Sequence, residues 1–196
     1  MVAEIVPLRI LAIAGSARRD SLNRKLQHVA CAALMQAGAK VTEVNLDDFP
    51  MPVYHGDLED REGLPLHARR LRSLMMEHQA LLIVSPENNA SIPAVLKNAL
   101  DWMSRPDGGQ NGLVPYQNKV ALLMSATPGA LGGLRGLQHL RQVLQALSVL
   151  VLSEQLGVPR AHEKFDADGK LNDPKLQASI TGLAQRLINV AGRLAA

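Results

Sequence analysis

The stretch from Arg9 to Asn23 reads RILAIAGSARRDSLN, and it joins a short apolar run to a loop of small and polar residues. The first six residues have the length of a strand and stop at Gly15 and Ser16, which is typical of a buried strand that ends in a turn. After Ser21 the apolar positions recur at helical spacing. The stretch therefore predicts a strand–loop–helix unit with a polar loop at the carboxyl end of its strand.

The same strand–helix pattern recurs five times along the chain. Apolar runs predict further strands at 41–46, 80–84, 119–124 and 149–152, and amphipathic runs predict helices at 22–38, 66–78, 92–103, 134–147 and 174–194. Residues 47–65 and 105–118 are expected to be loops. Continuous apolar strands alternating with helices favour a parallel sheet covered on both faces. We therefore expect an α/β fold, a flavodoxin-like three-layer sandwich with five parallel strands in the order 2-1-3-4-5.

Length and composition favour one globular domain spanning 1–196. The chain has 196 residues and 47% hydrophobic residues, which is enough apolar material for a core. Its net charge of +3 lacks the dense basic stripe of nucleic-acid binders, and 3% aromatic residues offer few platforms for base stacking. The single cysteine, Cys31, excludes an internal disulfide framework and is expected to be a buried filler.

No stretch of the sequence predicts a membrane segment or a signal peptide. The longest uncharged stretch, 120–134, contains Pro128 and is too short to span a bilayer. The apolar run 10–14 has strand length, and Glu4 and Pro7 precede it, which argues against a signal peptide. We expect a soluble, cytoplasmic protein.

The loop Gly15–Asn23 is a candidate anion site. It brings the Ser16 and Ser21 hydroxyls and the Arg18 guanidinium to a helix start, where unpaired N–H groups favour anions. It lacks the G-x-x-x-x-G-K-[ST] and G-x-G-x-x-G patterns, which disfavours a nucleoside triphosphatase and a dinucleotide site. From this loop alone, a solvated turn whose serine caps the helix remains an equal alternative.

Two further loops are expected at the same edge of the sheet, because ligands bind there where strand order reverses. Residues 85–91 read SPENNAS and bring several hydrogen-bond donors and acceptors close together, which suits a planar heterocycle. A solvated turn could have the same composition. Residues 125–133 read SATPGALGG, whose glycines permit close approach of a flat ligand. The alternative for Gly133 is tight packing of a helix on a strand.

Other kinds of site are disfavoured. The six histidines show no H-E-x-x-H spacing, so no metal site is expected. Ser16 and Ser125 lack a surrounding G-x-S-x-G, which argues against a serine hydrolase. Trp102 is expected to be a packing residue on its helix.

At these loops the sequence closely resembles the NADPH-dependent FMN reductase family, in particular its chromate and quinone reductase-like members. The family pattern G-S-x-R-x-x-S-x-N is met by Gly15–Asn23. The pattern P-E-Y-N-x-S-x-P, followed by L-K-N-A-[IL]-D-W, is met by Pro86–Trp102, except that Asn88 replaces tyrosine. The glycine-rich loop with G-G-x-R-x-x-x-x-L-R is met by Gly129–Arg141, and the similarity extends from about Leu8 to Leu152.

The resemblance implies an oxidoreductase with non-covalent FMN, NADPH or NADH as co-substrate, and a quinone, flavin, azo dye or chromate as acceptor. It implies that the phosphate is held by Ser16, Arg18, Ser21 and Asn23, and that the isoalloxazine is bordered by Pro86, Glu87, Asn88, Asn89 and Ser91 on one side and by Ser125, Thr127 and Gly129 on the other. The flavin would carry out the redox step, so no side chain is expected to be an essential acid, base or nucleophile.

The resemblance also implies a homodimer or homotetramer, in which Arg135 and Arg141 are expected to pair with acidic groups of another copy. Two alternatives stay open at this point. One is a non-enzymatic FMN electron carrier, although such proteins are typically acidic and rich in aromatic residues at the flavin. The other is a binding module that has lost the flavin, which the departure at Asn88 keeps open.

Overall fold

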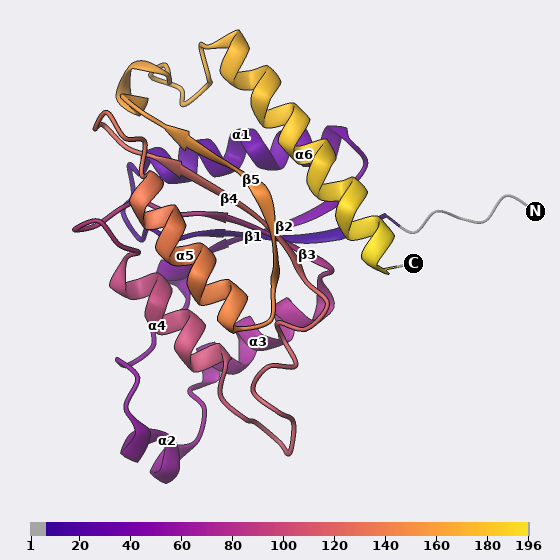
Figure 1. The fold of residues 1–196 in the computed structure, drawn as a ribbon. Helices are drawn as coiled ribbons and strands as arrows, with labels where there is room; N and C mark the ends of the chain where they lie inside the picture. The colour runs from indigo at the N-terminus through magenta and orange to yellow at the C-terminus, as the bar shows by residue number, and fades with distance from the viewer. Residues whose placement is uncertain (1–6, 196) are drawn as a thin grey trace, which may run out of the picture.

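Five parallel strands form one sheet in the order β2-β1-β3-β4-β5, with helices on both faces (Figure 1). The computed structural model describes residues 7–195, so residues 1–6 and 196 of the predicted domain lie outside the described range. The strands are β1 (Arg9–Ala14), β2 (Lys40–Asn45), β3 (Ala80–Val84), β4 (Val120–Ala126) and β5 (Leu150–Val158). The helices are α1 (Leu22–Gln36), α2 (Gly56–Glu62), α3 (Leu66–Glu77), α4 (Ala94–Met103), α5 (Leu134–Ala146) and α6 (Pro174–Ala195), with 3-10 turns η1 (Leu46–Asp48) and η2 (Ala161–Glu163). The predicted fold class and strand order are confirmed.

The sheet is buried on both faces because successive side chains of each strand point to opposite sides. In β1, Ile10 and Ala12 join the core under α1 and α6, whereas Leu11 and Ile13 join the core under α3, α4 and α5. Figure 1 shows these two helix layers on either side of the strands. All five residues of β3 are fully buried, which explains why the strand sequences are continuously apolar.

Two elements differ from the sequence-based expectation. The region 47–65, predicted as a loop, contains α2, none of whose residues is buried, so no apolar periodicity marked it. Strand β5 runs to Val158 rather than stopping at 152, because its register against β4 shifts between Ala121 and Leu123. The guanidinium of Arg141 donates to carbonyls at this irregularity, 2.7 Å to the Leu152 oxygen among others.

A buried arginine holds the loop that follows α4. Arg72 on α3 is 2% exposed, and its guanidinium donates to four backbone carbonyls. These carbonyls belong to Met103, Arg105, Asn111 and Gly112, at distances of 2.9–3.2 Å. The contacts fix the polar segment 105–118 against the end of α4, where carbonyls lack intrahelical partners.

Two interpretations of single residues are confirmed. Cys31 is fully buried on α1, and this burial raises the pKa of its thiol far above the usual range, as for an inert filler. Trp102 is fully buried on α4, and its indole N–H donates to the Pro52 carbonyl at 2.8 Å. Within residues 7–195, no helix combines the length and apolar character needed to cross a membrane.

Candidate functional site

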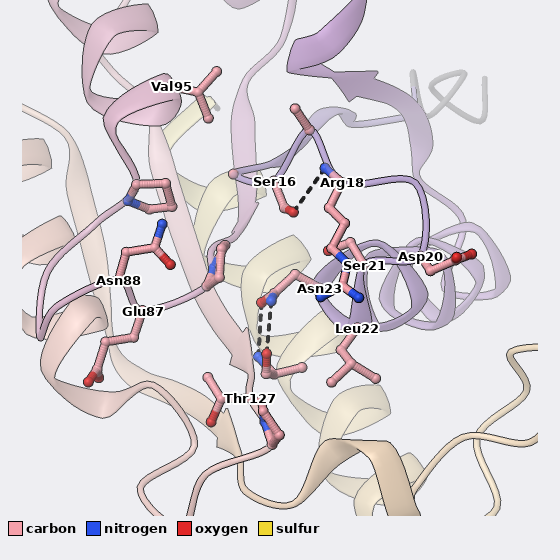
Figure 2. Close-up of a pocket in the computed structure, with 16 residues that line it drawn as sticks. Ser16, Arg18, Asp20, Ser21, Leu22, Asn23, Glu87, Asn88, Val95 and Thr127 are labelled. Carbon is pink, nitrogen blue, oxygen red and sulfur yellow. Dashed lines mark hydrogen bonds between the residues drawn. The ribbon is translucent and has the colours of Figure 1, made fainter.

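A cleft of about 440 Å³ opens at the carboxyl ends of β1, β3 and β4, where the predicted loops come together (Figure 2). This volume lies in the range typical of small-molecule sites, about 300–1,000 Å³. Eight of the residues expected at a cofactor site line it: Ser16, Arg18, Ser21, Asn23, Pro86, Glu87, Asn88 and Thr127. The start of α4 adds Pro93 and Val95, which the composition of the three loops did not point to.

The first loop gives the cleft an anion-binding end. The Ser21 hydroxyl oxygen accepts from the Arg24 N–H at 3.4 Å and caps α1, while the first helical bond runs from the Lys25 N–H to the Ser21 carbonyl. The N–H groups of Leu22 and Asn23 therefore have no partner within the helix. The Ser21 hydroxyl hydrogen is left to donate, because its oxygen serves as the acceptor in the cap.

Arg18 supplies the charge at this end of the cleft. Its backbone N–H donates to the Ser16 hydroxyl at 3.3 Å, which folds the loop tightly. The exposed guanidinium makes no hydrogen bond or ion pair with any residue in 7–195. Helix N–H groups, two hydroxyls and a forked cation form a donor set that fits a phosphate monoester.

Asn23 has a role that the sequence did not reveal. Its side chain is 3% exposed and forms two hydrogen bonds with the backbone of Ala126, at the end of β4 (Figure 2). The amide nitrogen donates to the Ala126 carbonyl at 2.8 Å, and the amide oxygen accepts from the Ala126 N–H at 2.9 Å. The side chain of Asn23 thus joins the first loop to the third, and its expected part in holding a phosphate stays a prediction.

The second loop is a tight turn that presents Asn88 at the cleft. Asn88 and Ser91 exchange two backbone hydrogen bonds of 2.9 Å, and the intervening Asn89 and Ala90 have φ angles of 48° and 63°. Positive φ at both central positions is the geometry of a type I′ turn. Asn89 and Ser91 do not line the cleft, and the Ser91 hydroxyl lies 3.0 Å from Nδ1 of His139, so their expected place beside a ligand stays a prediction.

Glu87 lines the cleft, but its carboxylate turns away from the cleft and caps a helix. Figure 2 shows its carboxylate turned away from Ser16 and Asn23. It accepts from the backbone N–H groups of Arg135 and Gly136, both at 3.1 Å, and from Nε of Arg135 at 2.8 Å. Because α5 begins after Gly133, which has no side chain, Glu87 takes the place of an N-cap. The sequence suggested that this carboxyl group contacts the polar edge of a ligand. In the structure it caps α5.

Because Glu87 is ionised when it caps α5, the free energy of unfolding is expected to depend on pH in the acid range. Burial by itself raises the pKa of the carboxyl group, but the Arg135 side chain and the Gly136 N–H outweigh it and hold the pKa below its usual range. The folded state thus binds the proton more weakly than the unfolded state, so this contribution is complete above the unfolded pKa of about 4.3 and is lost as pH falls through the folded pKa.

We expect Glu87→Gln to lower the free energy of unfolding by about 0.5–2 kcal/mol at pH 7, the usual cost of a lost helix cap. The variant should also lose stability less steeply than the native chain between about pH 4.3 and the acid transition. Urea unfolding across pH measures both effects. If the free energy of unfolding of the variant falls with decreasing pH as steeply as that of the native chain, another carboxyl group causes the acid sensitivity.

Two of the three glycines of the third loop, Gly132 and Gly133, serve packing. A Cβ atom at Gly133 would lie 2.0 Å from the hydroxyl oxygen of Ser125, and one at Gly132 would lie 2.8 Å from the Gly157 carbonyl carbon. Both glycines also have positive φ, 82° and 62°. Ser125 is fully buried behind Gly133, and neither Ser125 nor Gly129 lines the cleft, so their expected place beside a ligand stays a prediction.

Arg135 and Arg141 both have partners within the chain. Arg135 forms an ion pair with Glu87, and Arg141 binds the carbonyls of β5. The expectation that these two arginines pair with acidic groups of another copy stays a prediction, and any such contact would add to these intrachain ones.

The fold and the cleft together define a flavodoxin-like protein with a site for a phosphate-bearing ligand at the β1, β3 and β4 ends. The model of the family described as NADPH-dependent FMN reductase matches residues 8–163. The chain belongs to this family, and it is an NAD(P)H-dependent oxidoreductase whose cofactor is FMN. The family, fold, class of enzyme and cofactor expected from the sequence are confirmed.

Similar proteins carry related names. A probable NADPH:quinone oxidoreductase 2 of Oryza sativa is 33% identical over 192 residues, covering 95% of this chain and 90% of the relative. A 2-hydroxy-1,4-benzoquinone reductase of a Burkholderia species is 33% identical over 84% of this chain and 85% of its own. The structure of the flavoenzyme NAD(P)H:(acceptor) oxidoreductase FerB from Paracoccus denitrificans superposes with a TM-score of 0.79 at 27% identity, covering 95% of this chain and 98% of FerB.

Proposed function

We propose that this chain is an FMN-dependent NAD(P)H oxidoreductase whose physiological acceptors are quinones. The observation that carries the proposal is the cleft, which combines an anion-binding end at Arg18 with an opening between Asn88 and Thr127. Relatives named as quinone reductases support the choice of acceptor. When bound, FMN supplies the capacity to take up a hydride and to pass on its electrons.

The residues of the chain would bind and orient the cofactor. Ser16, Arg18 and Ser21, with the N–H groups at the start of α1, would hold the phosphate by charge-assisted hydrogen bonds. Asn88 and Pro86 would border the flavin on one side and Thr127 on the other. The lining of the cleft contains no histidine or cysteine, and its two acidic residues are Asp20 and Glu87, whose carboxylate caps α5.

Two measurements test the proposal. The purified protein should show the visible absorbance of an oxidised flavin, and it should oxidise NADPH when a quinone is the acceptor. If the protein binds flavin but does not oxidise NADPH with any small-molecule acceptor, the result favours an electron carrier that needs a protein partner. If the protein binds no FMN on titration, the result favours the alternative of a binding module that has lost the flavin.

Asn88 is expected to leave the cleft more open than the tyrosine that is usual in the family. Asn88→Tyr should tighten FMN by about 0.5–1.5 kcal/mol, the worth of an aromatic contact, so by about tenfold at most. The ring should also slow the reduction of bulky quinones relative to small ones. FMN titration and paired steady-state assays measure the two effects. If neither quantity changes, the side chain at this position does not face the flavin.

We also propose that the protein works in the cytoplasm as a homodimer or homotetramer. Two exposed leucines, Leu131 in the loop before α5 at 53% and Leu134 at the first position of α5 at 44%, offer apolar contact area. Sedimentation that gives a 21.1 kDa species at micromolar concentration would contradict the oligomer.

A further inference from the structure

The turn that presents Asn88 at the cleft has an unfavourable backbone conformation. Its central residues, Asn89 and Ala90, both lie in the left-handed region, with φ angles of 48° and 63°. Asparagine tolerates this region, but alanine rarely adopts it, because its Cβ atom then crowds the backbone. Such a conformation persists where the surrounding contacts impose it, and it is common at functional sites. The contacts around the turn therefore have to offset the strain at Ala90.

One face of α5 makes contacts at both ends of this turn. The Glu87 carboxylate, just before the turn, accepts from the backbone N–H groups of Arg135 and Gly136. At the other end, the Ser91 hydroxyl lies 3.0 Å from Nδ1 of His139. Arg135 and His139 are four residues apart, so they share a face of the helix and lie about 6 Å apart along its axis. Because the ends of a β-turn are less than about 7 Å apart, one helical turn can hold both ends.

Gly136, between these two contacts, lets the turn lie directly on the helix. A Cβ atom at Gly136 would lie 3.2 Å from the Cβ atom of Glu87 and 3.2 Å from the Ser91 carbonyl oxygen. Figure 2 shows the side chains of Asn88 and Glu87 pointing in opposite directions. Since Glu87 binds α5 and Asn88 lines the cleft, a displacement of the turn on α5 would move Asn88 within the cleft.

We propose that His139 is a positioning residue for the flavin, acting from outside the lining of the cleft. Through the Ser91 hydroxyl it holds the turn 88–91 in its strained conformation and keeps Asn88 where the flavin ring would bind. The proposal rests on the proposed function, because it takes Asn88 to border the flavin. Without His139, the turn would relax at its Ser91 end, while the phosphate contacts at Arg18 would stay intact.

Four substitutions separate this role from a general disturbance of α5. His139→Ala removes the contact with Ser91, whereas His139→Asn keeps a polar atom near the place of Nδ1, because both groups are attached at Cγ. Ala90→Gly removes the strain itself, since glycine adopts a positive φ without a steric penalty. Gln138→Ala is the matched control, because Gln138 is the exposed neighbour of His139 on α5 and does not line the cleft.

His139→Ala should weaken the binding of FMN and of riboflavin by the same factor, about two- to tenfold, as expected for the loss of one neutral hydrogen bond. His139→Asn should recover most of this loss, and so should Ala90→Gly when it is combined with His139→Ala. Gln138→Ala should leave both affinities unchanged. A loss in His139→Ala no larger than in the control would overturn the proposal, and so would a loss that Ala90→Gly does not reduce.

Amide hydrogen exchange in the full chain without flavin separates this proposal from the proposed function. The N–H groups of Asn88 and Ser91 are hydrogen-bonded across the turn, so their exchange should become about two- to tenfold faster in His139→Ala. Adding Ala90→Gly should slow it again. This pattern would support the positioning role even if the protein failed to oxidise NADPH with a quinone, a failure that would refute the proposed function alone. Exchange that His139→Ala leaves unchanged would refute the positioning role while NADPH oxidation continued.

Discussion

Asn23→Ala should lower the free energy of unfolding by about 2–5 kcal/mol, because the Ala126 N–H and carbonyl each lose a partner and a buried group left unpaired costs about 1–3 kcal/mol. Both groups belong to Ala126, which is 2% exposed. The two hydrogen bonds also join the start of α1 to the end of β4. The variant should therefore lose FMN affinity as well as stability, since it frees two of the three loops that border the cleft.

Chemical denaturation of the apoprotein measures the effect on stability. Asn189→Ala is a suitable control, because Asn189 is exposed on α6 and accepts from Gln185 at the surface. Its cost should stay within about 0.5 kcal/mol, as for most surface substitutions. If Asn23→Ala costs no more than the control, the amide is not a structural tie and its role is limited to the ligand.

Arg18→Ala is expected to weaken FMN by about 1.5–3 kcal/mol, the range for a hydrogen bond to a charged group. This corresponds to a loss of about 10- to 150-fold in affinity. Riboflavin, which lacks the phosphate, should bind with nearly unchanged affinity. The contrast between the two ligands isolates the phosphate contact from any general disturbance of the cleft, and fluorescence titration of the apoprotein measures both.

Arg19→Ala provides the matched control for this change. Arg19 is adjacent in sequence and exposed, but it does not line the cleft. The control should alter FMN affinity by the small amount that a distant, screened charge contributes. Equal losses for FMN and riboflavin in Arg18→Ala would defeat the phosphate assignment.

Elements that depend on local patterns were predictable from the sequence. Continuous apolar runs marked the strands β1, β3 and β4, since side chains on both faces of a parallel sheet are buried. The polar helix α2 was missed because it has no buried face to impose a period on its sequence. The extension of β5 was missed because the shift in register against β4 is a property of two strands together.

The sequence by itself determined the five-stranded fold and the edge of the sheet that carries the cleft, and it predicted an anion site in the loop around Arg18. These follow from short-range patterns: the period of apolar residues, the residues at helix ends, and the rule that parallel strands present their carboxyl ends together. Tertiary structure decided what the polar side chains of the loops do.

Glu87 and Asn23 have the residue types of ligand-binding groups, yet each pairs with backbone far away in the sequence, at Gly136 and Ala126. Ser125 is buried because Gly133 admits close packing against it. A buried N–H or carbonyl needs a partner, and which side chain supplies it depends on distances that only the packed chain defines. For this reason composition located the site, and the three-dimensional packing selected the residues that remain to contact a ligand.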